Sequence, residues 1–169
     1  MLHRVALTLA LCCLAASLRA ATWSLVGATG TWRFLRGTNE TSLPNTAAWR
    51  AAGFNDAAFA NASAPFWYDD VRPGGTQLTD MANRYGSIFH GKTFTVSNPA
   101  EIGALTLEAY CDDGYIAWIN GVAVVRYNVG AGNPTINTFA LGAASEPVPV
   151  IANATSAENS RWIPSGTGT

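Results

Sequence analysis

The feature that most constrains the fold is a run of strand-forming residues at 105–127, which contains two turn signals. The first signal is Asp-Asp-Gly at 112–114, and the second is Asn120-Gly121. Asn-Gly between alternating apolar segments is a strong β-hairpin signal, because both residues tolerate the positive φ of a type I′ turn. The sequence therefore predicts a tight hairpin centred on residues 120 and 121.

Counting outward from this turn predicts how the two strands of the hairpin pair. The predicted partners are Ile119 with Val122, Trp118 with Ala123, Ala117 with Val124, Ile116 with Val125 and Tyr115 with Arg126. Upstream, residues 105–111 alternate between apolar and polar, which is typical of a half-buried strand. Because the turn at 112–114 reverses the chain, these segments together predict a three-strand antiparallel meander.

Elsewhere the chain is rich in strand and turn signals and poor in helix signals. One helical turn is expected near residue 49, since Gly53 ends the only helical pattern. Residues 60–84 are interpreted as a long loop, residues 85–96 as a strand and residues 148–152 as an edge strand. This distribution predicts an all-β fold.

The N-terminus has the pattern of a secretory signal peptide at residues 1–20. A short positive segment precedes an apolar stretch at 5–18, which is too short to span a bilayer. The remaining residues, 21–169, are long enough for one domain. We therefore expect a secreted, extracellular or cell-surface protein without a membrane span.

Composition narrows the partners that this domain would bind. The chain has 12% charged residues, a formal net charge of −1 and no basic block, so we expect no nucleic acid partner. Removal of the signal peptide leaves Cys111 as the one cysteine. A single thiol on the apolar face of a strand favours a packing role over catalysis.

The long loop at 60–84 contains the best ligand-binding candidates, because aromatic faces stack on sugar rings and carboxylates accept hydroxyl hydrogen bonds. The candidate residues are Trp67, Tyr68, Asp69, Asp70 and Arg72. The alternative interpretation, which is favoured, is a loop anchored to the domain by its aromatic side chains.

Asp112 and Asp113 have two interpretations. Adjacent carboxylates are hard oxygen ligands that suit Ca²⁺, and the hairpin resembles that of calcium-dependent sugar-binding lectin modules. The favoured alternative is a structural turn, in which Asp accepts backbone N–H groups and Gly114 supplies a positive φ. No cofactor other than this Ca²⁺ is expected.

A series of short segments, in order along the chain, resembles the galactose-binding-like jelly-roll modules of large secreted bacterial proteins. Such modules stand beside lamin-tail or spore-coat-kinase-like domains. The matching segments are GTWRF at 30–34, TAAWR at 46–50, GFND at 53–56, APF at 64–66, GTQL at 75–78, KTFTV at 92–96, DDGYIAWING at 112–121 and RYN at 126–128.

The resemblance implies an antiparallel jelly-roll β-sandwich with no catalytic residues. It also implies that downstream domains of the same polypeptide are partners. Residues 162–167 resemble the turn before the last strand of such modules, so that strand is expected to be missing and the chain to be a fragment.

Three functions follow from these observations. The first is a non-catalytic accessory module that binds a glycan, and the second is a structural spacer that positions a downstream domain. The third is a glycan-active hydrolase using carboxylates among Asp69, Glu108, Asp112 and Asp113, which is disfavoured because nothing in the sequence determines their separation.

Overall fold

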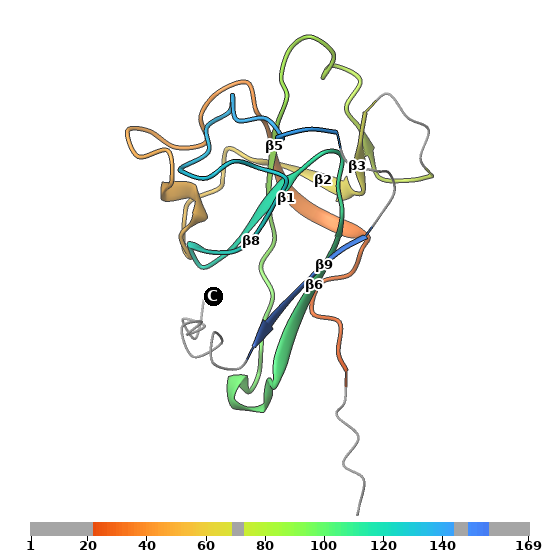
Figure 1. The fold of residues 1–169 in the computed structure, drawn as a ribbon, viewed down its shortest axis with the longest axis vertical. Helices are drawn as coiled ribbons and strands as arrows, with labels where there is room; N and C mark the ends of the chain where they lie inside the picture. Colours follow the sequence, from red (N-terminus) through yellow and green to blue (C-terminus); the bar gives the residue numbers. More distant parts are fainter. Residues whose placement is uncertain (1–21, 69–72, 144–148, 156–169) are drawn as a thin grey trace, which may run out of the picture.

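The computed structural model describes residues 22–68, 73–143 and 149–155, the last of these for its backbone (Figure 1). The signal peptide predicted at residues 1–20 lies outside the described residues. The strands are β1 (Gly30–Arg36), β2 (Ala60–Ala64), β3 (Phe66–Trp67), β4 (Thr76–Gln77), β5 (Ile88–Gly91), β6 (Ala104–Tyr110), β7 (Tyr115–Ile119), β8 (Val122–Tyr127) and β9 (Pro149–Thr155). Two 3₁₀ turns, Ala48–Arg50 and Pro99–Glu101, are the helical elements within these ranges. Within the described residues, the expectation of an all-β fold is confirmed.

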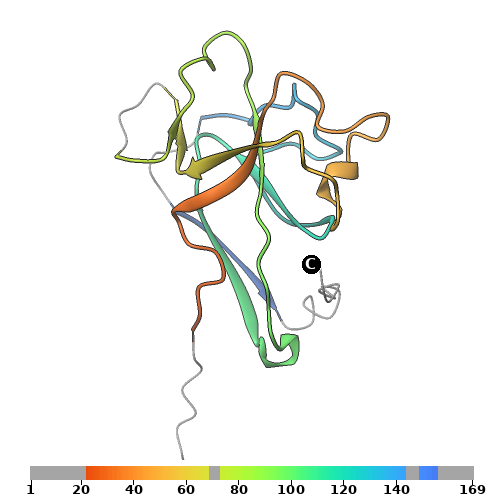
Figure 2. The same ribbon diagram turned by 180° about the vertical axis from the view of Figure 1, so that it is seen from behind.

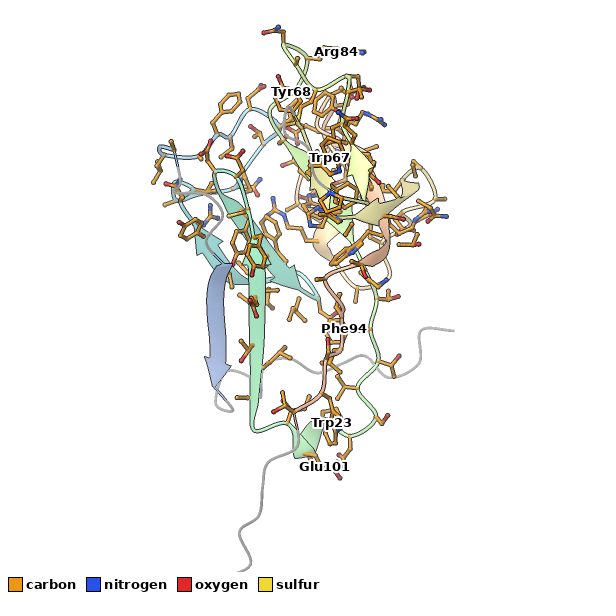
Figure 3. The ribbon with its side chains drawn as sticks, turned by 90° about the vertical axis from the view of Figure 1, so that its right-hand side faces the viewer. Trp23, Trp67, Tyr68, Arg84, Phe94 and Glu101 are labelled. Atoms are coloured by element: carbon orange, nitrogen blue, oxygen red, sulfur yellow. The ribbon has the colours of Figure 1, made fainter. Side chains whose placement is uncertain are left out.

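The strands form four small sheets. A three-stranded antiparallel sheet has the order β2-β1-β5, and three two-stranded pairs are β3-β4, β6-β9 and β7-β8. All pairings are antiparallel except β3-β4, which is parallel. Seen edge-on, β6 to β9 lie on one side and β1, β2 and β5 on the other, with side chains between them (Figure 3). The arrangement therefore has two layers.

The β7-β8 hairpin has the predicted turn but a different register further out. Asn120 and Gly121 have φ values of 50° and 86°, as the type I′ prediction requires. Ile119 pairs with Val122 as expected, but beyond Trp118 the register shifts, so that Ala117 faces Val125 and Tyr115 faces Tyr127. The predicted outer pairs were wrong because a β-bulge adds one residue to β8.

The predicted three-strand meander is also wrong, since β6 pairs with β9 instead of β7. The partners run from Ala104 with Thr155 to Tyr110 with Pro149. Strand β9 therefore spans Pro149–Thr155, where an edge strand was expected at 148–152; residue 148 lies outside the described residues. The turn after β6 packs against the end of β8, where Asn128 Nδ2 donates to Asp113 O at 3.0 Å. β7 then pairs with β8.

Two further boundaries differ from expectation. Residues 60–84 include β2, β3 and β4, because Pro65 lies between two short strands and β1 pairs with 60–64. The strand expected over 85–96 is limited to β5, whose ladder with β1 ends at the pair Arg33 and Gly91.

The buried core lies around β1 and the segments that cover it. Its buried hydrophobic residues, among those described, are Phe34, Phe59, Leu78 and Tyr85. Phe34 stacks on Phe66, with ring centroids 4.8 Å apart. Between the layers, Trp49 makes edge contacts with Phe89 of β5 and Trp118 of β7, at 5.3 and 5.4 Å. The 3₁₀ turn at Ala48–Arg50 thus connects the two layers through one indole ring.

Candidate functional site

The aromatic segment predicted to bind a ligand begins in strand β3, at Trp67, and continues at the exposed surface, at Tyr68. Trp67 is half-buried, and its indole N–H donates to Gly74 O at 2.9 Å. Leu78 N donates to Trp67 O at 2.8 Å as part of the parallel β3-β4 pair. Because its only polar group is occupied, Trp67 can offer a ligand only its ring.

Tyr68 is the exposed member of this segment, with 42% of its surface accessible. Figure 3 shows Tyr68 and Arg84 near the same end of the molecule, opposite Trp23 and Glu101. Asp69, Asp70 and Arg72 lie outside the described residues, so their part in a site stays a prediction.

Phe66 and His90 belong to the packing beneath this segment. His90 stacks on Phe66 at 5.5 Å and meets the edge of Trp32 at 5.2 Å. Part of the residue surface stays exposed, but the crowding of the imidazole by these rings lowers the pKa of His90 through desolvation. This environment is that of a packed histidine.

Asp112 and Asp113 lie in the turn between β6 and β7, separated from the end of β6 by one residue. Asp112 is exposed and Asp113 half-buried. The described part of the chain contains no cluster of three or more His, Cys, Asp or Glu side chains that could hold a metal ion. Calcium ligands at this turn would therefore include backbone or solvent oxygens, and Ca²⁺ binding here stays a prediction.

A surface hollow that the sequence did not indicate lies between three loops. We call it the Phe139 hollow; it has a volume of about 460 Å³. It is lined by residues 37–38 after β1, residues 83–86 before β5, and Ile136, Asn137 and Phe139. These segments come together at the left and top of Figure 1, and Figure 2 shows them from behind.

Backbone and side-chain hydrogen bonds hold the three loops together. Gly37 N donates to Ser87 O at 2.9 Å, and Ser87 Oγ donates to Ile136 O at 3.1 Å. Ile136 N donates to Glu40 Oε1 at 3.1 Å. The close approach requires glycine at 37, since a Cβ there would lie 2.6 Å from Ser87 O. The loops that line the hollow are therefore held in position by hydrogen bonds between them.

A charged network lies behind the wall that carries Tyr85. Asp80 accepts hydrogen bonds from Arg36 Nε at 3.1 Å and from the Tyr85 hydroxyl at 2.9 Å. The hydrogen bond from Tyr85 and then that from Arg36 lower the pKa of Asp80, while burial chiefly raises the pKa of Tyr85. A carboxylate held ionised in this way is unsuited to donate a proton, so it serves to fix the loop.

The surface of the hollow combines one aromatic ring with polar donors. Phe139 is 63% exposed and lies over Gly86, where a Cβ would come within 2.3 Å of the ring. The side-chain amides of Asn83 and Asn137 make no hydrogen bond within the described residues. Arg84 is 65% exposed at its side chain. An open ring beside amide and guanidinium groups can receive a polyhydroxylated ligand.

Sequence reasoning missed this hollow because its residues are separated by about a hundred positions. The usable local signal was an aromatic residue among polar neighbours at 137–139, in a segment with little strand pattern. No pattern in the sequence places that segment against residues 37 and 84.

Comparison with models of known protein families, with curated proteins and with solved structures gives no match. Within the described residues, no helix has the length and apolar character needed to cross a bilayer.

Proposed function

We propose that this chain is a secreted, non-catalytic accessory module that binds carbohydrate, built on a jelly-roll sandwich of the galactose-binding-like type. The observation that carries the proposal is the Phe139 hollow, in which an open aromatic ring lies beside uncommitted amide groups. The resemblance of the ordered sequence segments supports the same fold, and the signal-peptide pattern supports secretion.

The chemistry of the hollow suits sugars better than apolar ligands. Aromatic rings pack on the C–H face of a sugar, and stacking platforms of this kind tolerate a range of rings. Asn83 and Asn137 supply both N–H donors and carbonyl acceptors, the pair of functions that a hydroxyl group needs. A shallow, pre-formed site with few contacts favours weak binding, of the order of micromolar to millimolar dissociation constants.

The predicted segment at Trp67 and Tyr68 is the second candidate surface for the same ligand class. It contributes the Tyr68 ring and, by the sequence prediction, the carboxylates of Asp69 and Asp70 and the guanidinium of Arg72. It lies toward the same end of the molecule as Arg84 (Figure 3). A long glycan could therefore contact both surfaces.

A glycan array followed by affinity electrophoresis tests the proposal. We expect retention on at least one polysaccharide, lost in Phe139→Ala and reduced in Tyr68→Ala. Phe94→Ala is the matched control, because Phe94 is also an exposed aromatic residue, 38% accessible, but lies away from this end. Absence of retention on every glycan at high protein concentration would contradict the proposal and favour the spacer function.

Two side measurements separate the remaining alternatives. Retention that disappears with a chelator and in Asp113→Asn would assign Ca²⁺ to the turn at 112–113. Glycan hydrolysis by the purified chain, abolished in Asp113→Asn, would replace the proposal by an enzymatic function.

A further inference from the structure

We propose that the Phe139 hollow selects acidic sugars, such as uronic acids, through the guanidinium group of Arg84. This inference rests on the proposed carbohydrate-binding function and specifies its ligand class. It follows from how the charges around the hollow are distributed.

The carboxylate that forms an ion pair with Arg84 also binds two other groups. Asp80 contacts Arg36 Nε through both oxygens, at 3.1 and 3.0 Å, and also accepts the Tyr85 hydroxyl. Arg84 Nη1 lies 3.9 Å from the same carboxylate, beyond hydrogen-bonding distance. The Asp80 carboxylate thus lies near the guanidinium groups of both Arg36 and Arg84, and its shorter contacts are with Arg36.

A second carboxylate near the hollow, that of Glu40, also has partners. Glu40 accepts the backbone N–H of Ile136 at 3.1 Å, and its charge interacts with Arg50. Among the described residues, Arg84 therefore has one long ion pair, to a carboxylate that it shares with Arg36, and its guanidinium makes no hydrogen bond. A ligand carboxylate would supply a counter-charge that Arg84 does not have to share.

The backbone holds Arg84 in place while its charged group stays in solvent. The preceding turn is closed by Arg84 N and Tyr85 N, which donate to Met81 O at 3.0 and 3.3 Å. Tyr85 is 8% exposed and anchors the chain one residue later. Asn83, with a φ of 59°, lines the hollow beside Arg84. A planar guanidinium presented in this way can bind a carboxylate through two N–H groups.

Stacking and charge recognition would act on the same sugar ring. Phe139 would pack on the ring face and Arg84 would bind the carboxylate that a uronic acid carries in place of a primary alcohol. A neutral sugar would keep the stacking contact and lose the charge-assisted hydrogen bonds. Because these are stronger than neutral hydrogen bonds, we expect roughly tenfold tighter binding of the acidic form.

The test compares a polyuronate with its carboxyl-reduced, neutral counterpart, which share a backbone and differ in charge. Affinity electrophoresis of the full chain should show roughly tenfold stronger retention on the polyuronate, a preference that falls in high salt. Arg84→Gln should remove the preference and keep the weaker retention on the neutral polymer. Phe139→Ala should weaken retention on both.

Lys92→Gln is the control for overall charge, because it also removes one positive charge but lies outside the hollow, where Lys92 Nζ donates to Thr31 O. It should retain the preference. Equal retention on the two polymers, or a preference that survives Arg84→Gln, would overturn the acidic-sugar inference while leaving carbohydrate binding intact. Retention on neither polymer would overturn the inference, and the wider glycan array would then decide the proposed function separately.

Discussion

The region around β1 and the region of β6 differ in how far they bury their side chains. Phe34 in β1 is 2% exposed, and the loops that follow it contribute Phe59, Leu78 and Tyr85 to the same core. In β6, alternate residues are exposed or half-buried, and none is fully buried. Yet β6 has the more regular strand pattern in sequence.

The difference shows that a strand pattern and a buried core are separate properties. Alternation in β6 reflects which face points inward, whereas burial depends on what lies opposite that face. In β1, the ring of Phe34 is covered by the stacked ring of Phe66, at 4.8 Å, and β1 lies between β2 and β5 in its sheet. We therefore expect stability to depend more on the irregular segments around β1 than on the regular strand β6.

The largest expected loss of stability comes from a substitution in the core around β1. Phe34→Ala removes a buried ring and its stacked partner contact, and such substitutions cost about 3–5 kcal/mol of unfolding free energy. Urea denaturation monitored by tryptophan fluorescence would measure it. A loss below that of a half-buried residue in β6 would contradict the comparison.

A second prediction tests the turn that supports β3 and β4. Gly75 has a φ of 74°, and a Cβ there would lie 2.0 Å from Pro65 O, so Gly75→Ala should cost about 2–3 kcal/mol. Gly74 has a similar φ of 72° with nothing within 4 Å, so Gly74→Ala should cost about 1 kcal/mol from backbone strain alone. Equal losses in denaturation experiments would show that the close approach to Pro65 is unimportant.

A core-facing substitution in β6 should reduce the unfolding free energy less than Phe34→Ala does. Leu107 is half-buried on the inner side of β6. Leu107→Ala should therefore cost about 1–2 kcal/mol, below the range for fully buried leucines. The same urea titration measures it, and a loss equal to that of Phe34→Ala would mean that the two regions are equally packed.

The smallest expected effect is a loss of stability at low pH. The pKa of Asp80 is lowered in the folded state, so its contribution is complete above the unfolded value of about 3.9 and is lost as the pH falls through the folded pKa. The wild-type urea midpoint should drop between pH 5 and pH 2, and Asp80→Asn should reduce the size of this drop. Because these groups are screened by solvent, the change is expected to be small. An unchanged pH dependence in the variant would show that Asp80 has no part in it.

Local features of the fold were predictable from sequence where neighbouring residues determine the backbone. The Asn120-Gly121 turn, the alternation of β6 and the helical turn at 48–50 all follow from residues within a few positions. The β-bulge in β8 and the pairing of β6 with β9 did not, because each depends on contacts with distant segments. The short strands at 60–84 were missed for the same reason: β1 and β4 supply their partners.

The sequence by itself determined the secondary structure class and the positions of its tightest turns, since these depend on the conformational preferences of a few adjacent residues. It also indicated aromatic and acidic residues at 67–72 as candidates for binding. Only the tertiary structure showed that the Trp67 N–H is bound to Gly74 and that Arg84 and Phe139 line one hollow. Residues so far apart in the chain become neighbours only when the loops pack. The conformational preferences of adjacent residues do not determine that packing.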